Sequence, residues 1–353
     1  MTTGDHGGLD TRTRAWLTER ALPGLDLSAV SPLPGGFTND MRLVTTGQGE
    51  RYVLRRYRSS GTRMRRNTCA VETAVLERVA PTVPVVDVVA SDPYGDVTGR
   101  PTLVYRFVHG VSLGQVLAGK PTAAEAAGLG VAVGGVLAGI AAVRLPRPGP
   151  FHDVSLVPAE SGGEAADLPG FVERCLATGN GDALTPDETD ALRGLAARTG
   201  HRVAEVNGHS RLVHCDFNPK NVLVSRRGGR WDVVAVLDWE QAFSGSPLYD
   251  VGNMLRFAHL YPSSFVDGFV SGYRDAGGPL PRDWRELSRT LDLFTLADIL
   301  TAPPDAACFA GARTVLFRHL AHEQGPTSDR ARRVPRLRAR SAEHGARDHG
   351  ESP

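Results

Sequence analysis

The sequence has few lysines, few cysteines and almost no net charge, and each shortage excludes a class of protein. Among 353 residues only Lys120 and Lys220 are lysines, so arginine carries nearly all of the positive charge. The formal net charge of +1 is not the basic footprint of a nucleic-acid-binding protein. The four cysteines form no C-x-x-C pair, which argues against a zinc site or disulfide framework and fits a reducing cytoplasm. The pattern G-x-x-x-x-G-K-[ST] is also absent, which excludes a P-loop enzyme.

Long hydrophobic runs are scarce too. The least charged stretch, residues 123–143, consists mostly of alanine and glycine and contains Glu125. A buried core helix fits this composition better than a membrane span does. The first ten residues, MTTGDHGGLD, show neither the basic nor the apolar part of a secretory signal. We therefore expect a cytoplasmic protein, monomeric or homodimeric, with no membrane or nucleic-acid partner.

The hydrophobic pattern changes character near residue 108. Before it, alternating segments predict strands at 41–45, 51–57, 84–89 and 101–108, and helices are expected at 10–22 and around Val75. After it, helices are expected at 168–178, 186–205, 264–276 and 281–300, with an irregular region at 145–170. The pattern predicts an α+β protein with a small β-rich unit, 1–107, and a larger, mostly helical unit, 108–322. Residues 323–353 have almost no large apolar side chains and predict a disordered tail.

The stretch LVHCDFNPKNVLV, residues 212–224, is more polar than a turn between strands requires. Strands predicted at 222–224 and 233–237 flank a Gly-Gly turn and form a hairpin. The pairing should place Asn221 opposite Asp238 at the open end of the hairpin, about 5 Å apart, with Asp216 within reach. Two carboxylates and an amide oxygen suit Mg²⁺, whose other ligands would be water and substrate phosphates.

These residues carry a resemblance. His214-Cys215-Asp216 followed by Asn221 matches H-x-D-x-x-x-x-N, and Asp238-Trp239-Glu240 stands where kinases have the metal-binding D-F-G. With the intervening hairpin, the pattern resembles the aminoglycoside phosphotransferase family, kinase-like enzymes related to choline and homoserine kinases. The resemblance implies a bilobed protein-kinase-like fold that uses ATP or GTP as co-substrate.

The resemblance implies roles for the polar residues of the larger unit. Asp216 would be the catalytic base, while Asn221 and Asp238 would bind Mg²⁺ beside the nucleotide phosphates. His214 is expected to brace the loop, and Asp250 to cap a helix and hold the catalytic loop.

Lys220 is interpreted as an exposed, solvated lysine outside the active set.

The smaller unit fits the resemblance with one departure. In the strand RYVLRRY, Arg55 stands where kinases have the phosphate-pairing lysine, while Arg56 faces the opposite side. Glu72 would pair with Arg55, and Val53 would cover the adenine ring. The hinge around Phe107 would contact the adenine ring through its backbone.

A glycine-rich loop is only weakly indicated. The segment PGGFTND lacks the spacing G-x-G-x-x-G, but Gly35 and Gly36 would let backbone amides approach a phosphate.

The predicted function is transfer of the nucleotide γ-phosphoryl group to a hydroxyl of a small molecule. Acidic residues on the C-terminal helices, including Asp292, slightly favour a polyamine, so an aminoglycoside or cyclic-peptide antibiotic is the expected acceptor. Two alternatives stay open: a metabolic kinase for an acceptor such as homoserine or choline, and a pseudokinase that binds nucleotide without transfer.

Overall fold

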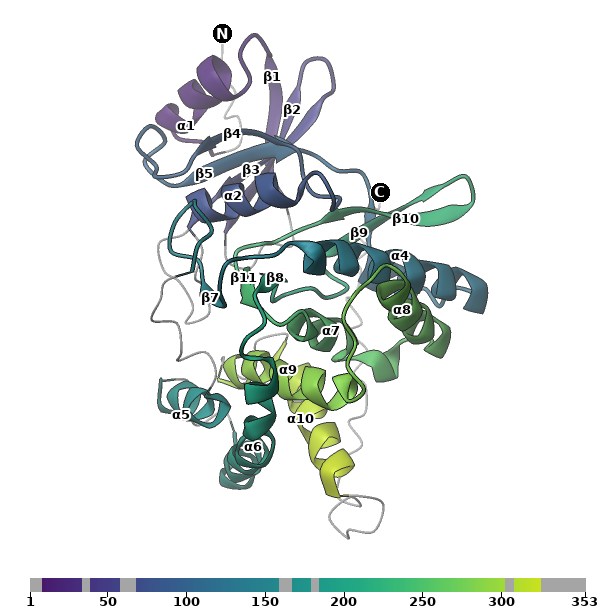
Figure 1. Ribbon diagram of the computed structural model, residues 1–353. Coiled ribbons are helices and arrows are strands. Elements are labelled where there is room, and N and C mark those ends of the chain that lie inside the picture. The colour runs from purple at the N-terminus through teal and green to yellow at the C-terminus, as the bar shows by residue number, and fades with distance from the viewer. Residues whose placement is uncertain are drawn as a thin grey trace, which may run out of the picture.

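The computed structural model describes residues 8–33, 39–57, 68–158, 167–178, 184–301 and 308–324. A twisted antiparallel sheet with two helices forms the N-terminal lobe, and helices dominate the C-terminal lobe (Figure 1). The sheet has the order β1-β2-β3-β5-β4. Its strands are β1 (Leu27–Pro32), β2 (Asp40–Thr46), β3 (Arg51–Arg56), β4 (Val88–Asp92) and β5 (Thr102–Arg106), and the flanking helical segments are α1 (Thr11–Trp16), η1 (Leu17–Ala21) and α2 (Cys69–Val79).

The side chains on both faces of the central strand β3 are buried, which explains why the strand has apolar residues at consecutive positions, 52–54, and not only at alternate ones. Tyr52 and Leu54 pack with Trp16 and Leu17 of the first helical segments. Val53 points to the other side and joins the core that continues into the C-terminal lobe. Because side chains alternate along a strand, Arg55 shares the face of Val53, which is the face of the predicted site.

Two sequence predictions for this lobe were wrong in detail. The strand predicted at 84–89 begins only at Val88, because Pro84 is used elsewhere: its carbonyl accepts a hydrogen bond from Val236 N in the other lobe, at 2.8 Å. Strand β1 was not predicted. Its sequence LSAVSP contains two serines and ends in proline, and such a segment is tolerated because β1 lies at the sheet edge.

The C-terminal lobe combines helices with two small three-stranded sheets, β10-β9-β6 and β7-β11-β8. Its helices are α3 (Leu113–Ala118), α4 (Ala123–Ala142), α5 (Leu168–Thr178), α6 (Pro186–Thr199), η4 (Gly200–Val206), α7 (Leu248–Leu255), η5 (Ala258–Leu260), α8 (Ser263–Asp275), α9 (Trp284–Leu300) and α10 (Phe309–Gln324). Its strands are β6 (Val111–Ser112), β7 (Gly149–Pro150), β8 (Arg211–Val213), β9 (Val222–Arg227), β10 (Arg230–Val236) and β11 (Phe243–Gly245). The irregular tail was expected after His322, but α10 continues to Gln324 and the later residues lie outside the described part.

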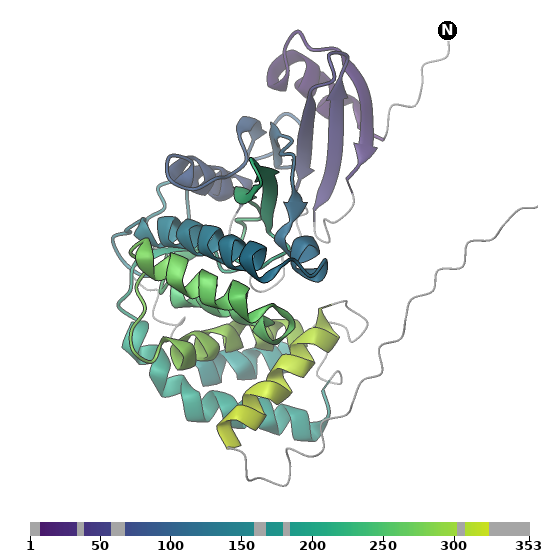
Figure 2. The ribbon, with the colours of Figure 1, turned by 90° about the vertical axis from the view of Figure 1, so that its right-hand side faces the viewer.

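The small-residue helix α4 lies side by side with α8 (Figure 2). Among the described residues it is the one helix long and apolar enough to span a membrane by length and composition. A Cβ atom on Gly130 would come within 2.2 Å of Phe265 O, and one on Gly268 within 2.3 Å of Ala127 O. The glycines therefore let the two backbones approach closely, and this packing accounts for the composition of α4.

Candidate active site

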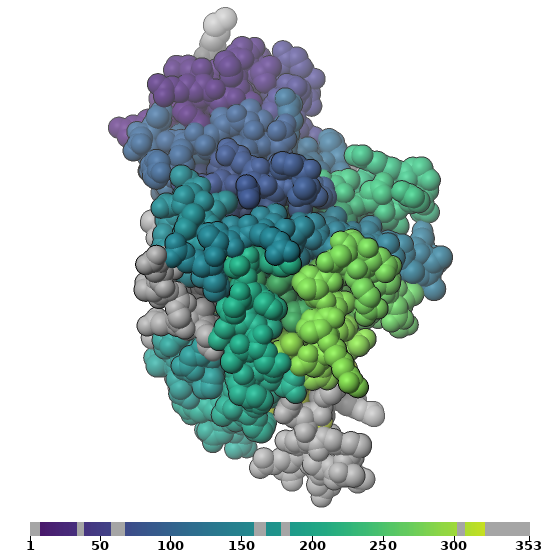
Figure 3. Space-filling model, in the orientation of Figure 1, coloured from purple at the N-terminus to yellow at the C-terminus, as the bar shows by residue number. Residues whose placement is uncertain are grey.

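The hairpin β9–β10 presents the predicted metal ligands at its open end, with a register one residue different from the prediction. Leu237 N donates to Asn221 O at 2.8 Å, so Leu237, not Asp238, stands opposite Asn221. The turn is centred between Gly228 and Gly229, one residue earlier than predicted, which alone would place Val236 opposite Asn221. A bulge between Val233 and Ala235 moves the pairing back by one residue, to Leu237. Asp238 is the next residue along the chain. In the space-filling view the hairpin emerges beneath the N-terminal lobe (Figure 3).

Asp216 lies in the loop before β9 and is surrounded by donors. Asn221 Nδ2 donates to its Oδ2 atom at 2.7 Å, and Asn218 Nδ2 donates to its Oδ1 atom. Lys220 Nζ lies 3.3 Å from Oδ2, although the Lys220 side chain is 66% exposed. The structure thus brings Asp216 and Asn221 together as predicted, and it adds Lys220, which the sequence interpretation left out.

Asp250 holds the backbone of this loop through two hydrogen bonds. Its two carboxylate oxygens accept from His214 N and Cys215 N, each at 2.8 Å. Asp250 holds the loop as expected, but it is not a helix cap: it is the third residue of α7, whose N-cap is Pro247. Cys215 has a φ of 65°, an uncommon conformation for a residue with a side chain, and these two bonds help to maintain it.

His214 also braces the loop, as predicted. Its ring is buried between Phe217 and Trp239. Its Nδ1 atom accepts from Asp216 N at 3.2 Å, so its Nε2–H donates to Leu237 O at 2.9 Å. Burial lowers the pKa of His214, which is consistent with this neutral tautomer. The histidine therefore ties the loop of Asp216 to the strand end beside Asp238.

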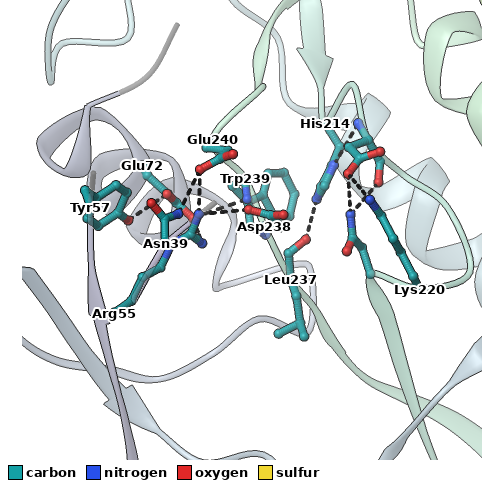
Figure 4. A network of polar contacts seen from close by, with 12 residues as sticks. Asn39, Arg55, Tyr57, Glu72, His214, Lys220, Leu237, Asp238, Trp239 and Glu240 are labelled. Atoms are coloured by element: carbon teal, nitrogen blue, oxygen red, sulfur yellow. Dashed lines mark hydrogen bonds and ion pairs between the residues drawn. The ribbon is translucent and has the colours of Figure 1, made fainter. Parts of the chain in front are cut away.

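Arg55 reaches from β3 across to the C-terminal lobe (Figure 4). Its guanidinium contacts Glu72 at 3.0 Å, Asp238 at 2.8 Å and Glu240 at 2.7 Å. The predicted pair of Arg55 with Glu72 is therefore part of a larger cluster, which also includes Asp238 and Glu240 of the other lobe. Since one guanidinium contacts three carboxylates, the cluster favours an additional cation.

Asp238 is turned toward this cluster by its backbone. Its φ of 67° lies in the left-handed region, which costs free energy for a residue with a Cβ atom and is found at functional sites. Burial alone would raise its pKa, but the charge of Arg55 and its hydrogen bond lower the pKa below the usual value. Asp238 is thus held as an anion.

The other predicted nucleotide contacts are placed as follows. Val53 is buried, at 3% exposed, on the same face as Arg55. Phe107 follows β5, and its N–H already donates to Arg51 O at 2.9 Å, so that amide is engaged within the protein. Gly35 and Gly36 lie outside the described residues.

Sequence reasoning missed the residues that complete the Arg55 cluster. Glu240 is buried and also accepts from Asn39 Nδ2 at 3.1 Å, while Tyr57 donates its hydroxyl to Glu72 at 2.7 Å. Glu240 belongs to the quoted D-W-E triplet, so its acidic side chain was visible in the sequence. No signal in the sequence pointed to Asn39, whose partner is 201 residues away.

The residues present fit a magnesium ion. Because Asn221 Nδ2 faces Asp216, its Oδ1 atom points away from that residue. Asp238 gives one oxygen to Arg55, which leaves its second oxygen for a cation, and its side chain is 36% exposed. No cluster of three His, Cys, Asp or Glu side chains suited to a metal occurs in the described part of the chain. Two protein oxygens, completed by substrate phosphates and water, are the arrangement that Mg²⁺ accepts.

The comparison with known families shows to which family the chain belongs. The pattern of the family described as "Phosphotransferase enzyme family" matches residues 29–288, which include the whole Arg55 cluster and the loop of Asp216. The chain belongs to this family. No curated protein matches this phosphotransferase in sequence.

Solved structures show the same fold at low identity. Aminoglycoside phosphotransferase APH(4)-Ia, in a ternary complex with ADP and hygromycin B, superimposes with a TM-score of 0.61 at 19% identity, covering 86% of this chain and 96% of that one. The GDP and kanamycin complex of APH(2")-IIIa gives a TM-score of 0.61 at 16% identity, covering 88% and 98%. The bilobed kinase-like fold expected from the sequence is confirmed.

Proposed function

We propose that this phosphotransferase transfers the γ-phosphoryl group of ATP or GTP to a hydroxyl group of a small molecule. The observation that carries the proposal is the position of Asp216, whose carboxylate is fixed by Asn221 and Lys220 just before the hairpin that leads to Asp238. Phosphoryl transfer needs positioning and charge neutralisation more than covalent catalysis, and this arrangement supplies both.

The residues divide the reaction between them. Asp216 accepts the proton of the acceptor hydroxyl while that oxygen forms its bond to the γ-phosphorus and the bond to the leaving diphosphate breaks. Arg55, released in part from its carboxylates, pairs with nucleotide phosphates, and Lys220 neutralises charge on the transferred group. Asn221 and Asp238 would hold Mg²⁺, which when bound would neutralise charge on the phosphates.

The acceptor remains open between an antibiotic and a metabolite. The neighbours in complex with hygromycin B and kanamycin support an antibiotic hydroxyl only through their fold. The electrostatic argument for a polyamine is weaker in the structure, because Asp292 is buried in an ion pair with Arg256 at 2.6 Å. A small-molecule hydroxyl is therefore the proposed acceptor class, with no preference for a polyamine.

Mass spectrometry of small-molecule products tests this function. The protein would be incubated with Mg²⁺, ATP or GTP, and a panel of aminoglycosides, cyclic-peptide antibiotics, homoserine, choline and pantothenate. We expect a product 80 Da heavier than one acceptor, the mass of one added phosphoryl group, which Asp216→Asn does not form. Asp232→Asn, an exposed aspartate on the hairpin, is the matched control. Nucleotide binding with neither a product nor nucleotide hydrolysis would favour the pseudokinase alternative.

A further inference from the structure

A large cavity lies in the C-terminal lobe among α6, α7, α9 and α10. Its volume is about 1180 Å³, slightly above the range of about 300–1,000 Å³ that is usual for sites that bind small molecules. Two carboxylates line it, Glu286 and Asp292. Six arginines also line it, so positive side chains outnumber the two acids: Arg202, Arg256, Arg285, Arg289, Arg313 and Arg318.

Part of this positive charge is neutralised within the protein and part is not. Arg202 pairs with Asp283, Arg256 with Asp292 and Arg313 with Glu188. In contrast, neither Arg285 nor Arg318 forms an ion pair with any described carboxylate, and both side chains are exposed.

The unpaired arginines come from two helices that border the same cavity. Arg285 stands in the first turn of α9, with its guanidinium 4.4 Å from the centre of the Trp284 ring. Arg318 comes from α10. Two guanidinium groups without an ion-pair partner among the described carboxylates, on different walls of one cavity, are suited to an anion, since arginine pairs bidentately with carboxylate and phosphate.

Helix α7 connects this cavity to the catalytic loop. Asp250, in its first turn, holds the backbone beside Asp216, and Arg256, directly after its last residue, lines the cavity. Six residues of helix span about 9 Å. The charge of Asp216 is also among the influences that raise the pKa of Arg256, after that of Asp292. Arg256 on the cavity wall therefore lies about 9 Å along α7 from the residue that holds the catalytic loop.

We propose that this cavity binds a carboxylate or phosphate group of the acceptor, while the acceptor hydroxyl lies at Asp216. This inference rests on the proposed function and narrows its acceptor class to hydroxyl compounds that also carry an anionic group. A polyamine would meet the net positive charge of the lining and is disfavoured.

The test measures binding of simple probes by calorimetry without nucleotide. The probes are trimesate, a rigid tricarboxylate; phenyl phosphate; and spermine. The variant is Arg285→Gln/Arg318→Gln, and Arg227→Gln/Arg230→Gln removes the same charge from the hairpin tip as a control. We expect at least one anion to bind more tightly than spermine, and its affinity to fall about tenfold or more in the cavity variant only. Whether trimesate or phenyl phosphate binds more tightly distinguishes a carboxylate from a phosphate.

Two results overturn the inference: spermine binding more tightly than both anions, or anion binding that the cavity variant leaves unchanged. Binding of AMP-PNP with Mg²⁺ and slow nucleotide hydrolysis, measured on the same samples, report on the proposed function separately. If these are present while the anions fail, only the acceptor class is wrong. If these are absent while an anion binds in the cavity, the proposed function fails and the cavity remains an anion site.

Discussion

The catalytic loop and the Arg55 cluster are built in different ways. The loop is local: Asp216 contacts Asn218, Lys220 and Asn221, all within five residues of it. The Arg55 cluster joins residues 17 to 185 positions apart, from both lobes. A short motif therefore determines the geometry around Asp216, whereas the geometry around Arg55 is complete only when the two lobes are docked.

Because of this difference, substitutions in the two regions should have different effects. Changes in the loop should affect the transfer rate and leave the fold intact. Changes in the cluster should affect stability and nucleotide affinity together, because three carboxylates depend on one guanidinium.

The largest effect is expected at Asp216. Asp216→Asn removes the proton acceptor and should lower kcat about a thousandfold, within the range of a lost general base. The unfolding temperature and the affinity for AMP-PNP should stay near those of the wild type, because the amide keeps the shape of the carboxylate. Steady-state kinetics and calorimetry would measure both. A variant with near-normal kcat would remove Asp216 from the mechanism.

Arg55→Ala should be the most destabilising change in the cluster. It leaves Glu72, Asp238 and Glu240 without their shared cation. Removing one partner of a buried ion pair lowers the free energy of unfolding by about 3–5 kcal/mol. Urea unfolding would measure the loss, and nucleotide affinity should fall with it.

Arg56→Ala is the matched control for this change. Arg56 is also buried but faces away from the site, pairing with Asp10 at 2.9 Å. It should lose stability without a comparable loss of nucleotide affinity. Equal nucleotide affinity in the two variants would show that Arg55 acts on stability alone.

A smaller effect is expected for Lys220→Met. The ammonium group lies 3.3 Å from Asp216 Oδ2, where it can neutralise the phosphoryl group as it passes to the acceptor. We expect kcat to fall about tenfold to a hundredfold with little change in the KM for nucleotide. Lys120→Met, a change in the only other lysine, is the control. Unchanged kcat would return Lys220 to the exposed, solvated role that the sequence suggested.

The same contrast explains what could be predicted from the sequence. H-x-D-x-x-x-x-N and D-W-E predicted the site because local spacing determines which side chains meet around Asp216. The register of Asp238 was missed by one residue, because the turn is centred between Gly228 and Gly229 and not at Gly229/Arg230, and the bulge beside Val233 offsets only part of that difference. Asn39 could not be predicted, because its contact with Glu240 depends on how the lobes dock. The arginine-lined cavity was also missed, because its arginines come from helices up to 116 positions apart in sequence.

The smallest effect is expected from the protonation of Asp250, which tests how a single buried carboxyl group changes stability with pH. Burial outweighs the two amide hydrogen bonds and raises its pKa from 3.8 to about 7. Between these values the folded protein keeps a proton that the unfolded chain releases, so stability falls as pH rises from about 4 to 7. From pH 5 to 7 this linkage amounts to about 2 kcal/mol, or a few degrees in Tm. Asp250→Asn has no such proton, so the Tm of the wild type minus that of the variant should decrease over this interval in scanning calorimetry. Parallel pH profiles would show that Asp250 is ionised throughout and that its two amide bonds outweigh its burial.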